Sequence, residues 1–281
     1  MKTQIIIQLI AIEGFASTVA TCDQPTIHYT SMGCTPSEQT NDLGCPISFD
    51  CLNLSNRRKD KCYLFGKTYN LLEDVPYKEI SSACIGQAKC VNFTTPEAYF
   101  INAHNDCPEF FRYWGANCVL QYTVGECCST GKVCDDDRNA LEKCSLDGKT
   151  YLEGERMQIP GDPCRTCICS KDFDETNIMS SEKCFVQKCS FEINNEFKPE
   201  AAPVYRADMC CPWFWRSPAA TDKVIKGAGT IDDPKLQCNY GDLTLNVGDS
   251  LEPVTTANGV GTCSCSIPPL VHCTLAKEGM N

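Results

Sequence analysis

The sequence predicts a tandem multi-domain protein made of small disulfide-rich modules, mostly short antiparallel β-hairpins and sheets with irregular loops. Three observations support this fold class. Of 281 residues, 24 are cysteine, a density typical of a disulfide scaffold. Hydrophobic residues make up 42% of the chain, and much of that share is Cys, so the apolar material is thin for one large continuous core. The cysteines also recur at a regular spacing.

Residues 1–20 have the features of a secretory signal peptide. Lys2 precedes an apolar run over 5–12, and Ala20 offers a small residue at which a leader can be cleaved. The run is too short to span a bilayer, and no later stretch approaches the required length. We therefore expect a secreted, extracellular protein without a membrane span.

Secretion decides the chemistry expected of the cysteines. Thiols form disulfides in an oxidising compartment, whereas a zinc finger needs paired Cys or His ligands at short spacing. Only Cys164 and Cys167 have that local form, so we favour disulfides and expect neither a metal ion nor another cofactor. The predicted disulfide cysteines are Cys62, Cys84, Cys90, Cys107, Cys118, Cys127, Cys128, Cys134, Cys144, Cys164, Cys167, Cys169, Cys184, Cys189, Cys210, Cys211, Cys238, Cys263, Cys265 and Cys273.

An internal repeat organises the chain. A nine-residue segment that begins at Lys61 returns 82 residues later at Lys143 with seven of nine positions identical, and a weaker copy begins at Gln237. Residues in these segments alternate between two faces, and Gly148 and Gly154 stand where turns or bulges need positive φ. Each copy therefore predicts a β-hairpin, which opens the part of a repeat that we call the head.

The second part of each repeat, the tail, ends in a cysteine pair such as Cys127 and Cys128. Heads and tails divide the cysteines into blocks of 4, 8, 8 and 4, and even numbers are expected if each block closes on itself. The predicted domains are a signal peptide (1–20), an N-terminal half-repeat that is a lone tail (21–58), a first repeat (59–137), a second repeat (138–217), a linker (218–235) and a C-terminal half-repeat that is a lone head (236–281).

The less regular segments are expected to be loops or linkers. Residues 170–183 and 190–209 show neither a helical nor a strand period and are expected to be loops held by cysteines. The acidic run 135–137 is expected to be a solvated linker. Two sequons, at Asn53 and Asn92, predict N-linked sugars on exposed loops.

The repeat resembles the von Willebrand factor type C (VWC) module. The resemblance lies in the order Cys144-x3-Gly148-x2-Tyr151, then Cys164-x2-Cys167-x-Cys169, then Cys184-x4-Cys189, then Cys210-Cys211. It is good over 144–211, recognisable over 62–134, and extends over half a module at each end.

The chain departs from that pattern at several cysteine positions. The first repeat has only Cys84 and Cys90 in place of the triplet. Gly44 replaces the leading cysteine of the first tail pair, and Val260 replaces the first cysteine of the last triplet. Ser217 stands where the second repeat would have its closing cysteine.

The resemblance implies extracellular binding and no catalysis. Similar modules occur in chordin-like and kielin-like secreted proteins, several of which bind growth factors of the bone morphogenetic protein (BMP) and transforming growth factor beta (TGF-β) class. In such proteins the head sheet and the segment before it contact the ligand. This points to Leu146, Tyr151, Ile159 and Ile168 as partner-binding residues, although Tyr151 and Ile168 would equally suit the small core beside the disulfides.

Aromatic side chains next to the second tail suggest a further contact surface. Trp213, Phe214 and Trp215 follow its cysteine pair, and exposed aromatic residues dominate many binding energies. Packing against a neighbouring module is the alternative. A second aromatic cluster occupies 110–114.

Other function classes are disfavoured. The net charge of −11 and the scattered Lys and Arg residues argue against nucleic acid as a partner. The three histidines, His28, His104 and His272, accompany no nucleophile motif, so we expect no catalytic residue and no enzyme. The alternatives to a growth-factor modulator are a self-associating structural protein of matrix or secretory fluid and, more weakly, a protease inhibitor that presents a loop at 162–165 with Arg165. The oligomeric state stays open.

We predict that reduction unfolds the repeats. Closing a loop of roughly 20 residues stabilises a fold by about 3 kcal/mol, while a whole domain is stable by only about 0.1 kcal/mol per residue. Far-UV circular dichroism should therefore lose its sheet signal in strong reductant at a temperature where the oxidised protein keeps it. Retention of that signal would contradict the prediction.

Overall fold

The computed structural model confirms the predicted fold class, because it consists of small antiparallel β-sheets with a few short helices, cross-linked by disulfides. It describes residues 22, 24–51, 54, 57–94, 96–111, 115–206, 209–256 and 259–276. The predicted signal peptide and the sequon asparagine Asn53 lie outside these residues. In the described part of the chain, no helix is long and apolar enough to cross a membrane.

The elements follow the repeats in order. The N-terminal half-repeat contains α1 (Ile27–Ser31), β1 (Thr35–Pro36) and β2 (Phe49–Asp50). The first repeat contains β3 (Cys62–Leu64), β4 (Lys67–Tyr69), α2 (Tyr77–Ile80), β5 (Ile85–Val91), β6 (Tyr99–His104), β7 (Cys118–Gln121), β8 (Gly131–Cys134) and the start of α3 (Asp135–Asn139), with 3-10 turns at Ser81–Ala83 and Pro108–Phe110.

The second half of the chain is richer in strands. The second repeat contains β9 (Lys143–Leu146), β10 (Lys149–Leu152), β11 (Arg156–Ile159), β12 (Asp162–Ile168), a 3-10 segment (Glu175–Ser180), β13 (Cys184–Val186), β14 (Ala202–Tyr205) and β15 (Phe214–Arg216). Then follow β16 (Val224–Ile225), β17 (Gln237–Tyr240), β18 (Leu243–Asn246), β19 (Ser250–Leu251), β20 (Val254–Thr256), β21 (Gly259–Ser264) and β22 (His272–Leu275).

The predicted head hairpins are present in all three copies. Strands β3 and β4, β9 and β10, and β17 and β18 form two-stranded antiparallel sheets. Gly148 turns the second hairpin with φ 72°, and Gly154 follows with φ 88°, in the left-handed region that glycine enters without steric cost. The period-two pattern of the sequence therefore located these strands correctly.

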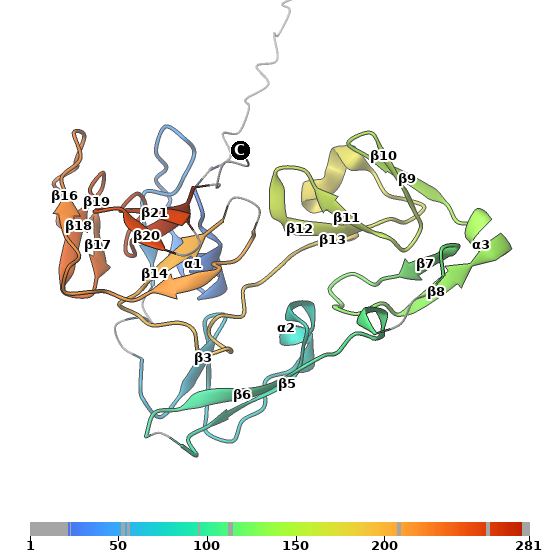
Figure 1. The fold of residues 1–281 in the computed structure, drawn as a ribbon, viewed down its shortest axis with the longest axis horizontal. Helices are drawn as coiled ribbons and strands as arrows, with labels where there is room; N and C mark the ends of the chain where they lie inside the picture. The colour runs from blue at the N-terminus through green and yellow to red at the C-terminus, as the bar shows by residue number, and fades with distance from the viewer. Residues whose placement is uncertain are drawn as a thin grey trace, which may run out of the picture.

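The two half-repeats lie side by side, although they occupy opposite ends of the sequence. In Figure 1, α1 of the N-terminal half-repeat lies next to β14 and β21, while β5–β8 of the first repeat and β9–β13 of the second lie further away. The sheet of the C-terminal half-repeat continues into the second repeat, because β14 pairs in parallel with β22 and antiparallel with β15. Among the residues that the structure describes, four small apolar clusters take the place of one core.

Twelve disulfides pair all 24 cysteines, and each block closes on itself. Three bonds occupy the same places in both complete repeats. They are a head bond (Cys62–Cys90, Cys144–Cys169), a head-to-tail bond (Cys84–Cys127, Cys164–Cys210) and a tail bond (Cys107–Cys128, Cys189–Cys211).

Where one copy of the repeat lacks a disulfide that another copy has, both of its cysteines are absent. Cys167–Cys184 and Cys263–Cys273 join neighbouring strands, and the first repeat has Ala88 opposite Asn102 at that place. The head-to-tail bond is absent between the half-repeats, where Val260 and Gly44 occupy the two positions. Each loss therefore removes a whole bond and leaves no unpaired thiol.

Two expected linkers are structured. The acidic run 135–137 forms the first turn of α3, where carboxylates favour the positive end of the helix dipole. The segment 218–235 contains β16, which pairs with β19. It is tied further by the buried carboxylate of Asp249, which accepts hydrogen bonds from Lys226 Nζ (2.8 Å) and Thr230 Oγ1 (2.7 Å). Although burial raises the pKa of Asp249, these bonds lower it to about 2.

The expected loops are also partly regular. Residues 170–183 include the 3-10 segment Glu175–Ser180. Residues 190–209 include β14, all of whose residues are buried. The strand β14 was not recognisable from its own sequence because it is completed by pairing with β22, about 70 residues further along the chain.

We predict that the missing bond of the first repeat can be restored. The double variant Ala88→Cys/Asn102→Cys should form a thirteenth disulfide, because the two residues are direct antiparallel partners. A disulfide that closes a loop of about 15 residues stabilises the folded state by about 3 kcal/mol. The substitution also removes the hydrogen bond from Asn102 Nδ2 to Ile193 O, which costs about 1 kcal/mol. Denaturant titration should show a higher free energy of unfolding than in the control Ala88→Ser/Asn102→Ser, and a thiol assay should find no free cysteine. Free thiols, or an unchanged free energy of unfolding, would contradict the prediction.

Candidate ligand-binding groove

A groove of about 530 Å³ lies where the first repeat meets the second. Its walls come from three segments, the approach to β3 (57–63), the end of the β5–β6 hairpin (94–100) and a turn of the second repeat (192–199). The lining residues are Arg57, Arg58, Lys59, Lys61, Cys62, Tyr63, Thr94, Glu97, Ala98, Tyr99, Phe100, Glu192, Asn195, Phe197 and Pro199.

Hydrogen bonds from asparagine side chains to backbone groups fix the wall that the second repeat supplies. The amide of Asn195 donates to Phe100 O (3.0 Å) and accepts from Phe100 N (3.3 Å). Asn102 Nδ2 donates to Ile193 O at 3.0 Å. These bonds attach the turn 192–199 to strand β6, and so join two of the three wall segments of the groove.

A buried ion pair forms part of the groove wall. The Arg57 guanidinium donates to the carboxylate of Glu192, which also accepts from Phe65 N at 3.0 Å. Arg57 lies over the rings of Tyr63 and Phe197, at 4.8 and 4.7 Å from their centroids. Burial raises the pKa of Glu192, and the charge of Arg57 opposes that rise.

The groove is locally cationic in a chain of net charge −11. Four of its lining residues are Lys or Arg and two are Glu. Lys59 pairs with Glu97 at 2.7 Å, and Arg58 with Asp60 at 2.7 Å. The hydrogen bond from Arg58 lowers the pKa of Asp60, and the hydrogen bond from Lys59 to Glu97 raises the pKa of Lys59.

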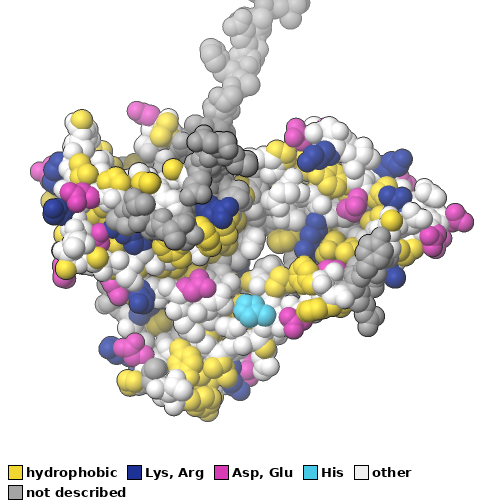
Figure 2. Space-filling view, viewed as in Figure 1, with side chains coloured by type: hydrophobic (Ala, Val, Ile, Leu, Met, Phe, Trp, Pro, Cys, Tyr) yellow, Lys and Arg dark blue, Asp and Glu magenta, His cyan; other side chains and the backbone are white. Residues whose placement is uncertain are grey.

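Exposed apolar residues lie near the groove. Figure 2 shows hydrophobic side chains gathered at the lower end of the molecule, over the end of the β5–β6 hairpin, with charged side chains of both signs beside them. Phe93 is 70% exposed there. A protein partner would therefore meet apolar and charged groups on one continuous face.

The sequence did not single out this groove. The Lys and Arg residues were expected to be scattered, yet four of the five residues from 57 to 61 are basic, which was an available signal. The wall at 192–199 carried no signal, because it joins the groove from more than 90 residues away in the sequence.

The four partner-binding residues predicted in the second repeat surround its small core. Leu146 and Ile168 are buried, and Tyr151 and Ile159 are half-buried against the cluster of Cys144, Leu146, Met157, Cys167 and Cys169. The structure thus places them as core or near-core residues, and a ligand contact through them stays a prediction.

The aromatic triplet after the second tail separates into three environments. Trp215 packs against Phe191 and Phe197, with ring centroids 5.0 Å away in each case. Phe214 packs against the cluster of the C-terminal half-repeat. Trp213 is 37% exposed, with the guanidinium of Arg206 at 4.8 Å from its ring centroid. Only Trp213 therefore offers substantial surface.

The remaining predicted positions are surface features. Asn92 is exposed directly after β5, and its sequon residue Thr94 donates to the Tyr99 hydroxyl at 2.9 Å. His104 is exposed at the end of β6. Phe110 and Phe111 are exposed, and the rest of that aromatic cluster, 112–114, lies outside the described residues.

The loop expected of a protease inhibitor is not formed. Residues 162–168 are strand β12, and Arg165 pairs across the sheet with Val186. Its side chain is only 14% exposed, and Nε donates to Asp162 Oδ2 at 3.2 Å. Arg165 is therefore not presented to a protease, and this expectation was wrong.

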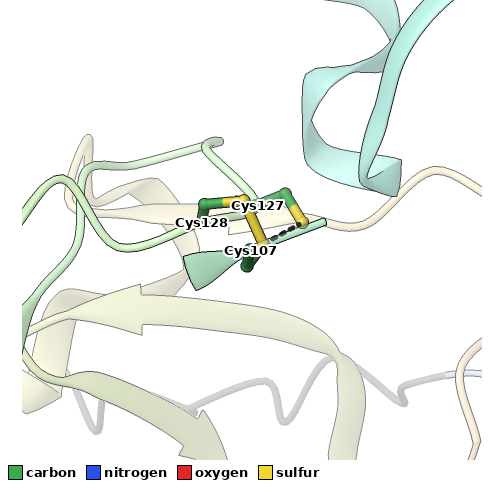
Figure 3. Close-up of side chains that lie close together, drawn as sticks. All are labelled: Cys107, Cys127 and Cys128. Atoms are coloured by element: carbon green, nitrogen blue, oxygen red, sulfur yellow. Dashed lines mark hydrogen bonds between the residues drawn. A yellow bond between two sulfur atoms is a disulfide. The ribbon is translucent and has the colours of Figure 1, made fainter. Parts of the chain in front are cut away.

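In the described part of the chain, two groups of three cysteines have sulfur atoms close enough together to suggest a metal site, but these sulfurs form disulfides. Figure 3 shows Cys107 bonded to Cys128, with the sulfur of Cys127 3.4 Å from that of Cys107. Cys127 is itself bonded to Cys84. Metal binding by cysteine requires a thiolate, and none of these sulfurs is one. The same arrangement recurs at Cys189, Cys210 and Cys211.

The chain matches no protein-family model, and no solved structure matches it.

We predict that Arg57→Met destabilises the protein by about 3–5 kcal/mol, because it leaves the buried carboxylate of Glu192 unpaired. The double variant Arg57→Met/Glu192→Gln removes that charge and should recover most of the loss. Arg58→Met, whose side chain is exposed, should change stability by less than about 0.5 kcal/mol. Urea denaturation of the three variants measures the pattern, and equal effects of Arg57→Met and Arg58→Met would contradict it.

Proposed function

We propose that the protein is a secreted, non-catalytic binding protein of the VWC-module kind, and that its ligand is a growth factor of the BMP and TGF-β class. The twelve disulfides are compatible with an extracellular protein. The growth-factor class rests on the sequence resemblance alone. The observation that carries binding itself is the cationic and aromatic groove between the two repeats.

The groove is suited to binding because its walls are already ordered. Cys62 in one wall is bonded to Cys90, and the turn that carries Glu192 starts from Cys189, which is bonded to Cys211. A site held in place before the ligand arrives loses little conformational entropy on binding. Affinity then depends on the chemistry of the exposed groups.

That chemistry favours an acidic and partly apolar protein surface. Tyr and Arg are enriched where protein interfaces gain most of their free energy, and here Arg57 lies over Tyr63. Lys59 and Arg58 stand at the exposed rim, where charges accelerate association with a partner of opposite sign. A ligand with carboxylates around an apolar centre would complement both parts.

The test is capture of growth-factor dimers from a panel of this class by the oxidised, glycosylated protein on a sensor surface. We expect at least one ligand to bind, and Lys59→Glu/Lys61→Glu to weaken it at least tenfold, because the double change reverses the charge of the rim. Lys171→Glu/Lys235→Glu makes the same change of charge at two exposed lysines outside the groove, so it is a matched control that should bind normally.

Two results would count against the proposal. Absence of capture across the panel would remove the growth-factor class. Equal loss of binding in the Lys59→Glu/Lys61→Glu variant and in the Lys171→Glu/Lys235→Glu control would show that net charge alone governs binding, and would remove the groove as the site.

A further inference from the structure

The two half-repeats contact each other through a compact set of buried groups. The hydroxyl of Tyr29, in α1, donates to Ile267 O at 2.6 Å and accepts from Leu270 N at 2.9 Å. Phe49 N donates to Pro268 O at 2.8 Å, and the rings of Tyr29 and Phe49 stack at 4.4 Å. This contact joins residues about 240 positions apart in the sequence.

No covalent bond secures this contact. Each complete repeat joins its head to its tail through a disulfide, Cys84–Cys127 or Cys164–Cys210. The four cysteines of the N-terminal half-repeat bond only among themselves, as Cys22–Cys45 and Cys34–Cys51. The half-repeats are therefore held to each other by burial and hydrogen bonds alone.

Two of the three histidines in the chain are buried at this same place. His28, in α1, is fully buried, and its Nδ1 lies 2.8 Å from the Tyr205 hydroxyl of β14. Its Nε2 is buried without a hydrogen-bond partner. His272, in β22, is also buried, with Ser266 Oγ 3.3 Å from its Nδ1.

The surroundings keep both imidazoles neutral. Burial, and then the repulsion that a protonated His272 would exert, hold the pKa of His28 well below its usual range, and burial lowers the pKa of His272 to about 4. The groups that face them are the phenols of Tyr29 and Tyr205 and the hydroxyl of Ser266. Among the described residues, no carboxylate is hydrogen-bonded to either ring.

We propose that this contact is an acid-sensitive clasp between the ends of the chain, closed while His28 and His272 are neutral and opened when they are protonated. In the open state each imidazole reaches water and regains its ordinary basicity. The clasp then exposes the apolar faces of Tyr29 and Phe49 on one side and the 267–270 loop on the other.

The direction of the pH effect follows from proton linkage. A histidine whose pKa is depressed in the closed state favours closure above its ordinary pKa of 6.5, and this preference is lost as the pH falls from there toward about 4. For His272 alone, the equilibrium constant for opening rises about 30-fold between pH 7.5 and pH 5. His28 adds to this in the same direction.

The test uses the full chain with a recognition sequence for a site-specific protease inserted after Leu54. Since no disulfide leaves the N-terminal half-repeat, cleavage leaves it bound through the clasp and its neighbouring contacts alone. Arg57 and Glu192 stay together on the larger fragment, so the titration of Glu192 does not act across the cut. The dissociation constant of the fragment is then measured from pH 7.5 to pH 5.

We expect retention at pH 7.5, at least 30-fold weaker binding at pH 5, and rebinding after neutralisation. The variant His28→Asn/His272→Gln, which keeps polar groups without a proton to gain, should change less than threefold over that range. His104→Asn removes the exposed histidine and should behave like the unsubstituted protein.

If the double variant does not bind at any pH, the pH dependence of the unsubstituted fragment still tests the proposal. The logarithm of its dissociation constant should rise by about one to two for each unit that the pH falls between pH 6 and pH 5. This slope corresponds to the uptake of one proton by each histidine that titrates. A constant that does not change with pH, or the same pH dependence in the double variant, would overturn the proposal.

Discussion

Covalent cross-linking is the constraint on which the rest of the structure depends. The four apolar clusters are small, and cysteines are members of each of them. A core of this size cannot offset the conformational entropy of an ordered chain by burial alone. The disulfides reduce that cost in the unfolded state, so long irregular segments, such as those between β13 and β14, can be held without continuous secondary structure.

The distribution of the bonds shows how the fold tolerates their loss. The first repeat keeps the strand pairing of Ala88 with Asn102 where the other copies have a disulfide. The half-repeats have no head-to-tail bond and contact each other through buried hydrogen bonds to Tyr29. The stability of a disulfide does not depend on the protonation of nearby side chains. The stability of a contact that buries titratable side chains does, because burial disfavours their charged form. The ends of the chain therefore differ in kind from the two complete repeats.

The sequence was informative wherever the structure depends on local signals. The alternation from Tyr63 to Thr68 and the glycine at Gly148 located the head hairpins, because period and positive φ are properties of neighbouring residues. The order within the segment 218–235, which the sequence predicts to be a linker, was not foreseen, because it comes from Asp249 and β19, which lie further along the chain. The groove was missed for the same reason, because the turn 192–199 reaches it only through tertiary contacts.

One turn of the second repeat connects the groove to the contact between the half-repeats. Cys189 N donates to Ser31 Oγ of α1, and three residues later Glu192 pairs with Arg57 in the groove wall. The disulfide Cys189–Cys211 anchors this turn, so it is fixed at one end and contacts both sites. A ligand that changed the position of Glu192 would therefore act on this packed segment, and thermodynamic linkage would make any resulting effect on closure of the half-repeats reciprocal.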